Sequence, residues 1–200
     1  MNGMRGFSLI ELIVGMAILG ILMSIGIPAF SDWMRNARVR TTAESVLNGL
    51  QLARAEAVRR NTTVGLYLVT NTTNSCELIT ANESTAGVPW IVSVNSPVAP
   101  TPLCHIGPSD DTQPIIIQTR GGTESGSAAT NVTTDVASVV FNGLGRSTGG
   151  NVTIDFERPA GEACREDGGP VRCLRVVVSV GGQIRMCDPA LPDTDAQGCG

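Results

Sequence analysis

Residues 7–27 read FSLIELIVGMAILGILMSIGI, an apolar run of 21 residues in which Glu11 is the only charged side chain. As an α-helix that rises about 1.5 Å per residue, the run reaches roughly 31 Å, which matches the hydrocarbon core of a bilayer. A carboxylate inside a membrane helix is unfavourable and normally faces a partner. The stretch therefore predicts a membrane-spanning helix whose one acid makes a specific contact.

A short basic leader, MNGMRG, precedes this run. Cleavage between Gly6 and Phe7 would give Phe7 a free amine, and that amine is mostly protonated at neutral pH. If Glu11 of one chain binds the Phe7 amine of the next, the contact is head-to-tail and does not close, so it generates a filament. A secretory signal peptide, whose apolar core is shorter and carries no acid, and a plain membrane anchor fit the pattern less well.

The stretch MRGFSLIELIVGMAILGIL resembles the class III signal and amino-terminal helix of type IV pilins and type II secretion pseudopilins. The resemblance implies that a prepilin peptidase cleaves after Gly6 and methylates Phe7, and that Glu11 promotes assembly. It also implies that the helix bends at Pro28, with Gly20 as a further weak point upstream.

The cysteines indicate disulfide bonds rather than a metal site, because the chain has no CxxC pair and a single histidine. Six cysteines permit fifteen pairings. Proximity in the sequence favours three pairs: Cys76 with Cys104, Cys164 with Cys173, and Cys187 with Cys199. The last two pairs close short loops and are favoured more strongly than the first. Disulfides form in oxidising compartments, so residues beyond about 30 are expected in a periplasm. No cofactor, metal site or catalytic constellation is predicted.

Two different patterns follow Pro28. Apolar residues first recur every three or four positions, which predicts an amphipathic helix. The stripe consists of Val39, Ala43, Val46, Leu47, Leu50, Ala53 and Ala57. Short β-branched runs separated by Gly, Pro, Asn and Thr then predict an antiparallel β head. The expected strands are 63–70, 90–94, 115–119, 138–141, 152–157, 174–180 and 183–187.

The predicted fold is α+β, with a long amino-terminal helix packed on an antiparallel β head that carries disulfides. Its expected parts are the leader 1–6, the membrane and assembly helix 7–28, the amphipathic helix 29–61 and the head 62–200. A tight hairpin of the primed type is expected at Gly181-Gly182. Long exposed loops are expected at 71–87, 95–113 and 120–135.

The neck sequence LNGLQLARAEAVRRN and the closing GxxR-x-C hairpin resemble the minor pilin branch that includes FimT, FimU and the H-type pseudopilin. Some FimT-type pilins bind DNA through a GRxR motif in this hairpin, where the present chain has Gly182-Gln183-Ile184-Arg185 and lacks the first arginine. The candidate DNA contacts are Arg172, Arg175 and Arg185. Residues 61–200 carry seven arginines against fourteen acids, a formal charge of −7 that disfavours phosphate binding.

These features together predict a structural subunit rather than an enzyme. The resemblance implies a minor pilin with a single pass through the bacterial inner membrane and its head in the periplasm. It then enters a type IV pilus at or near the tip and supports assembly. Expected partners are prepilin peptidase, other major and minor pilins or pseudopilins, and inner-membrane lipid. The alternatives are an H-type minor pseudopilin of a type II secretion system and a DNA-binding pilin for natural transformation.

Overall fold

The computed structural model describes residues 9–73, 76–80, 85–87, 89–98, 102–105, 107–108, 114–122, 130–158 and 163–200. One long helix is followed by short strands. The elements are α1 (Leu9–Arg60), β1 (Val64–Leu68), β2 (Thr85–Ala86), β3 (Trp90–Ser93), β4 (Ile116–Arg120), β5 (Asn131–Thr134), β6 (Ser138–Phe141), β7 (Val152–Glu157), the 3-10 helix η2 (Arg165–Asp167), β8 (Leu174–Val178) and β9 (Ile184–Cys187).

The chain divides into two compact units, residues 1–35 and 36–200. In the first unit, α1 exposes a long series of apolar side chains. They are Leu9, Ile10, Leu12, Ile13, Val14, Met16, Ile18, Leu19, Ile21, Leu22 and Met23. Within the part of the chain that the structure describes, no helix has both the length and the hydropathy needed to cross a membrane.

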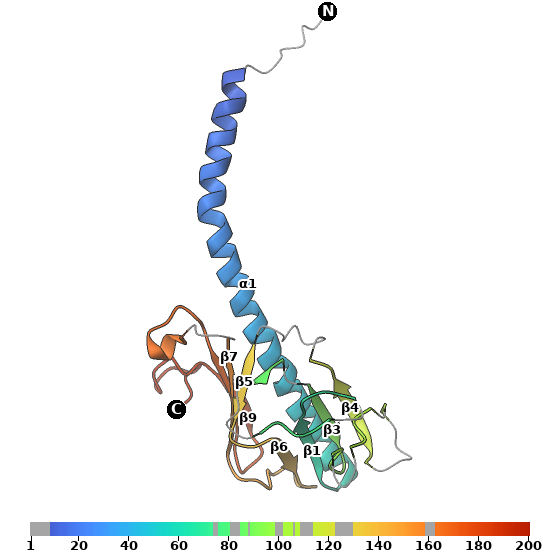
Figure 1. Ribbon diagram of the computed structural model, residues 1–200. Coiled ribbons are helices and arrows are strands. Elements are labelled where there is room, and N and C mark those ends of the chain that lie inside the picture. Colours follow the sequence, from blue (N-terminus) through green and yellow to red (C-terminus); the bar gives the residue numbers. More distant parts are fainter. Residues whose placement is uncertain are drawn as a thin grey trace, which may run out of the picture. The chain divides into compact units, whose positions relative to one another are not determined.

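The second unit holds two antiparallel sheets. The first has the strand order β4-β3-β1-β6 and the second has the order β2-β5-β7-β8-β9. Figure 1 shows both sheets gathered around the carboxy-terminal part of α1. The predicted α+β fold, with a helix packed on antiparallel strands, is therefore confirmed.

A single main core joins the helix to both sheets. The apolar stripe predicted on the helix is its centre: Val39, Ala43, Leu50, Ala53 and Ala57 have no exposed surface. The spacing of three and four residues places these side chains on one face, and that face packs on inward residues of β1, β6, β7 and β8. Burial alternates along β7 and β8, as expected for strands with one covered face.

A second, smaller core covers the other face of the first sheet. Strand β1 is buried along its whole length, because Leu66 and Leu68 face α1 while Tyr67 packs in the second core. The disulfide Cys76–Cys104 lies in this second core. The loops that it joins thus cover the sheet face that α1 leaves open.

All six cysteines are paired. The pairs are Cys76–Cys104, Cys164–Cys173 and Cys187–Cys199, with Cα separations of 6.2, 5.5 and 5.1 Å. These distances lie in the ordinary range for a disulfide. The predicted pairing of sequence neighbours is confirmed.

All three segments predicted as long exposed loops contain a strand or buried residues; in 95–113 the buried residues include Cys104, which lies in the second core. The segment 120–135 contains β5, and the segment 71–87 contains β2 together with the buried residues Cys76 and Ile79. Strand β5 reads NVTT, whose polar content conceals the alternation of buried Val132 and Thr134. The buried Thr134 hydroxyl accepts a hydrogen bond from the Val136 amide, and its single proton lies within reach of the Val136 and Thr153 carbonyl oxygens.

The prediction of a primed two-residue turn between the last two strands was also wrong. The amide of Ser179 donates to the Gln183 carbonyl oxygen, and the amide of Gly182 donates to the Ser179 carbonyl oxygen. Gly182 has φ +80°, while Gly181 does not lie in the left-handed region. This is the three-residue loop in which a type I turn is followed by a left-handed glycine. Strand β8 ends at Val178 because this longer turn begins at Ser179.

Candidate assembly and binding sites

The predicted assembly residues lie at the beginning of the chain. Gly6 and Phe7 fall outside the described residues, and Glu11 lies in the first turn of α1. A carboxylate there is favoured by the positive end of the helix dipole. Gly20 and Pro28 both lie within the continuous run of α1, and the bend expected at them stays a prediction.

Arg172, the first candidate DNA contact, binds a buried acid. Its Nε lies 2.7 Å from Oδ2 of Asp188, whose side chain is only 5% exposed. A second guanidinium nitrogen donates to Oε1 of Gln197, and the Arg172 backbone amide donates to Oδ1 of Asn36. Arg172, which lies just before β8, thus contacts both α1 at Asn36, the first residue of the second unit, and the loop after β9.

Arg175, the second candidate, lies on the outer face of the second sheet opposite Asp155. Its Nε donates to Oδ1 of Asp155 at 2.6 Å, and the hydrogen bond raises the pKa of the guanidinium. Glu157 belongs to the same strand as Asp155. Burial raises the pKa of Glu157, and the carboxylates of Asp155, Asp167 and Glu166 raise it further. The surroundings of Arg175 are therefore acidic.

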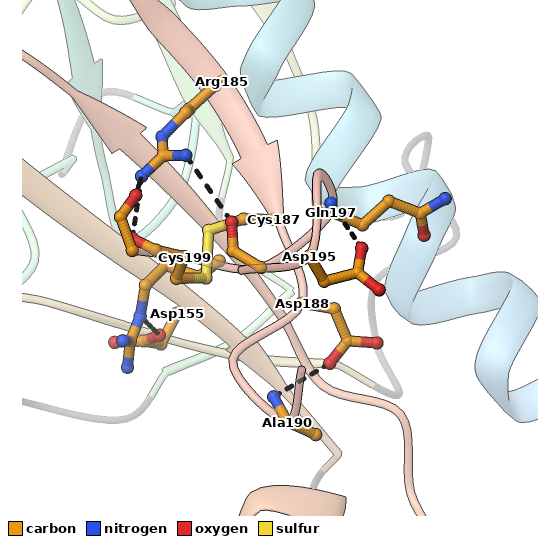
Figure 2. Close-up of a disulfide and its surroundings, with 11 residues drawn as sticks. Asp155, Arg185, Cys187, Asp188, Ala190, Asp195, Gln197 and Cys199 are labelled. Carbon is orange, nitrogen blue, oxygen red and sulfur yellow. Dashed lines mark hydrogen bonds and ion pairs between the residues drawn. A yellow bond between two sulfur atoms is a disulfide. The ribbon is translucent and has the colours of Figure 1, made fainter. Parts of the chain in front are cut away.

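Arg185, the third candidate, binds carbonyl oxygens of the last residues of the chain. One guanidinium nitrogen donates to the carbonyl oxygen of Cys199 at 2.7 Å and also to that of Gly200. Figure 2 shows Arg185 beside the disulfide that joins Cys187 to Cys199. The strand register places Arg185 opposite Val177, diagonal to Arg175 on the same face of the sheet.

The structure therefore brings Arg175 and Arg185 onto one face and places Arg172 before β8. Each of the three side chains donates to a protein oxygen. A phosphate would have to displace these acceptors, and the Asp155 and Asp188 carboxylates would repel it. The arrangement favours a role in holding the second sheet and the final loop together.

The segment 188–197, which we call the acidic loop, follows β9 and is closed by the Cys187–Cys199 disulfide. The Ala190 amide donates to Oδ1 of Asp188, and the Gln197 amide donates to Oδ1 of Asp195 (Figure 2). The Asp188 amide donates to the Gln197 carbonyl oxygen, which joins the two ends of the loop. Asp193 and Asp195 are exposed.

A shallow groove of about 610 Å³ lies between the last turns of α1 and the start of β9. We call it the helix–hairpin groove. Its lining residues are Gln51, Arg54, Ala55, Val58, Arg59 and Ile184. Sequence reasoning missed it, although Ala55 and Val58 stand at a spacing of three outside the buried stripe and are flanked by Arg54 and Arg59. Apolar residues on the solvent side of an amphipathic helix were the available signal.

Among the described residues, no group of three or more His, Cys, Asp or Glu side chains is placed to hold a metal ion. His105 is exposed in its loop.

The fold and the amino-terminal sequence together define a class. Residues 1–27 match the model of the prokaryotic N-terminal methylation motif. A protein in which such a motif precedes a long amino-terminal helix, packed on antiparallel sheets in a head that carries disulfides, is type IV pilin-like. Residues 42–182 match the model of the type II transport protein GspH, and the chain belongs to this family.

Curated relatives match over shorter stretches. A fimbrial protein of Moraxella nonliquefaciens is 43% identical over 51 residues, which are 26% of this chain and 32% of the relative. The pilin-like protein PilA1 of Thermus thermophilus is 36% identical over 66 residues, which are 33% of this chain and 41% of the relative. A fimbrial protein of Pseudomonas aeruginosa is 40% identical over 58 residues, 29% of this chain and 37% of the relative. The chain thus spans about a third of the length of these relatives.

A solved structure resembles nearly the whole chain. The crystal structure of the type IV minor pilin FimU of Pseudomonas aeruginosa superposes with a TM-score of 0.51 at 14% identity. The match covers 84% of this chain and 99% of the FimU chain in that structure. At this identity, the similarity is one of fold.

Proposed function

We propose that the protein is a minor pilin, a structural subunit that enters a type IV pilus at or near its tip and supports pilus assembly. The observation that carries the proposal is the match of residues 1–27 to the N-terminal methylation motif, on a helix that exposes apolar side chains from Leu9 to Met23. Such a surface is unfavourable in water and favourable against lipid or the helices of other subunits.

In this proposal a prepilin peptidase cleaves between Gly6 and Phe7 and methylates the new amine. The chain then stays in the inner membrane, with residues beyond about 30 in the periplasm. An oxidising periplasm agrees with three disulfides and no free thiol in the chain. Pairing of Glu11 with the Phe7 amine of the next subunit lets two opposite charges compensate each other in apolar surroundings.

The test compares Glu11→Ala with Glu44→Ala. Glu44 also lies on α1, where it is paired with the neighbouring Arg40, so its loss removes a helix carboxylate outside the predicted assembly contact. The proposal expects both variants to be cleaved and membrane-bound, as measured by mass spectrometry and fractionation. Only Glu11→Ala should be lost from sheared, purified filaments. Normal incorporation of Glu11→Ala would contradict the pairing, and a mature chain that keeps its six-residue leader would contradict the whole proposal.

The second candidate is an H-type minor pseudopilin of a type II secretion system. It is supported by the match of residues 42–182 to a model described as a type II transport protein. Deletion of the gene separates the two candidates. If the protein is a pilus subunit, the deletion should reduce the number of surface pili and leave export intact. If it is a pseudopilin, the deletion should block export and leave pili unchanged.

A further inference from the structure

The helix–hairpin groove combines an apolar floor with a basic rim. Ala55, Val58 and Ile184 supply apolar surface, and Val58 is 52% exposed. Arg54 is held at the rim because its Nε donates to the Gly145 carbonyl oxygen at 3.1 Å. Arg59 is 62% exposed and binds Glu56 of its own helix. The groove thus suits a short protein segment that carries an apolar side chain next to a carboxylate.

The acidic loop of the same chain has this chemistry. Leu191 and Pro192 supply apolar surface directly before Asp193, and Asp195 follows. The loop is also preformed, because the Asp195 amide donates to the Pro192 carbonyl oxygen and the disulfide closes the whole segment. A rigid segment loses little conformational entropy when it binds, which favours its docking.

The groove and the acidic loop lie toward opposite ends of the helical segment 36–60. The loop is tied to the beginning of this segment, since Arg172 binds Asp188 and Gln197 and its amide donates to Asn36. At about 1.5 Å per residue, Ala55 lies roughly 29 Å further along the helix axis than Asn36. These ties hold the acidic loop toward the end of the segment opposite its own groove, so the occupant we consider is the loop of a second copy shifted along the axis.

We propose that the helix–hairpin groove of one copy receives the acidic loop of a second copy. The inference rests on the proposed function, because it describes a contact between successive filament subunits. The two surfaces differ, so the contact is heterologous and repeats from copy to copy without closing. The proposal requires a short run of neighbouring copies, each with its Asp193 carboxylate at the Arg54 and Arg59 rim of the next.

Nucleic acid fits the groove less well. Affinity for DNA comes mainly from neutralising many phosphates, whereas this groove offers two guanidinium groups, one of which binds Glu56. Its apolar floor matches a protein side chain better than a sugar–phosphate backbone. The acidic surroundings of β7 and η2 also oppose a long polyanion.

The first experiment maps the neighbour of the groove by photo-crosslinking in purified filaments. Gln51→p-benzoylphenylalanine is placed in the full-length chain, and Ala37→p-benzoylphenylalanine serves as the control on an exposed position of α1 outside the groove. Copies labelled with ¹⁴N and ¹⁵N are mixed so that mass spectrometry identifies links between two chains. The expected link joins position 51 of one copy to residues 188–197 of another, and the control gives no such link.

The second experiment fills the groove without removing a hydrogen bond. Ala55→Glu adds bulk and negative charge to the lining, and Ala37→Glu adds the same side chain elsewhere on α1. We expect Ala55→Glu to lower the 51-to-loop link at least tenfold and Ala37→Glu to leave it unchanged. Adding Asp193→Arg to Ala55→Glu should restore part of the link, because the charges are then complementary.

The outcomes separate the two proposals. If filaments contain the chain but show no link, the inference is overturned and the proposed function stands. The same holds if each filament contains a single copy of the chain. Filaments without the chain overturn both. A link from position 51 to an added single-stranded DNA oligonucleotide, in place of the acidic loop, would assign the groove to nucleic acid and likewise overturn the inference.

Discussion

Replacing Arg172 by alanine tests whether the candidate DNA contacts are internal supports. The Asp188 side chain is 5% exposed and would keep the Ala190 amide as its hydrogen-bond donor while losing the guanidinium. Removing one partner of a fully buried ion pair typically costs about 3–5 kcal/mol. Because Arg172 is 40% exposed and water can replace part of its contact, we expect about 2–3 kcal/mol.

Arg175→Ala is the matched control. Its ion pair with Asp155 is 29% and 26% exposed, so the remaining carboxylate stays in contact with water and we expect a loss of about 1 kcal/mol. At about 3 °C per kcal/mol for a unit of this size, Tm should fall by roughly 6–9 °C for Arg172→Ala and by about 3 °C for Arg175→Ala.

The melting curves can be followed in the full-length chain in detergent by tryptophan fluorescence, because Trp90 is 2% exposed in the main core whereas Trp33 is already 66% exposed in the folded chain. A Tm difference between the two variants below about 2 °C would refute the reasoning. So would an Arg172→Ala protein of unchanged Tm that had lost a salt-sensitive gel shift with DNA, because the guanidinium would then serve a ligand.

Two further predictions concern the hairpin and the acidic outer face. Gly182→Ala should lower stability by about 2–4 kcal/mol, because a left-handed φ is strained for alanine and its Cβ would meet the Gly145 carbonyl oxygen. Gly181→Ala should change stability by less than about 0.5 kcal/mol, since its Cβ would have only ordinary contacts; equal denaturant midpoints would contradict this. Glu157→Gln should raise Tm at pH 7, because the raised pKa means that ionising Glu157 destabilises the folded state. That gain should disappear as pH falls below the unfolded pKa of 4.5, where the carboxyl is protonated in both states, and a gain that persisted there in pH-dependent melts would count against the assignment.

The parts of the fold that follow a strong hydrophobic period could be predicted from the sequence. In the stripe from Val39 to Ala57 an apolar residue recurs every three or four positions, and the structure buries the helix face that this period indicates. The closing hairpin was located but its turn was wrong, because Gly181-Gly182 accommodates both a primed turn and a type I turn followed by a left-handed glycine. Only the hydrogen bonds from Ser179 and Gly182 distinguish the two.

The candidate binding sites were less predictable, since they depend on which side chains meet across the fold. The sequence places Arg172 and Asp188 sixteen positions apart and gives no sign that they bind each other. Strand β5 was missed for a related reason: Thr134 is polar but buried, and its hydrogen-bond partners include the carbonyl oxygen of Thr153 on β7. Such contacts are satisfied by neighbours that are distant in the chain.

The order of the three disulfides bears on how the molecule reaches its oxidised form. The first and second, third and fourth, and fifth and sixth cysteines along the chain are paired, with separations of 28, 9 and 12 residues, so the three closed loops neither overlap nor interlace. Short separations give the two thiols of a pair a high effective concentration for each other. A chain that emerges amino end first therefore presents its thiols to an oxidant in native pairs, and correct bonding needs no later exchange between mispaired sulfurs.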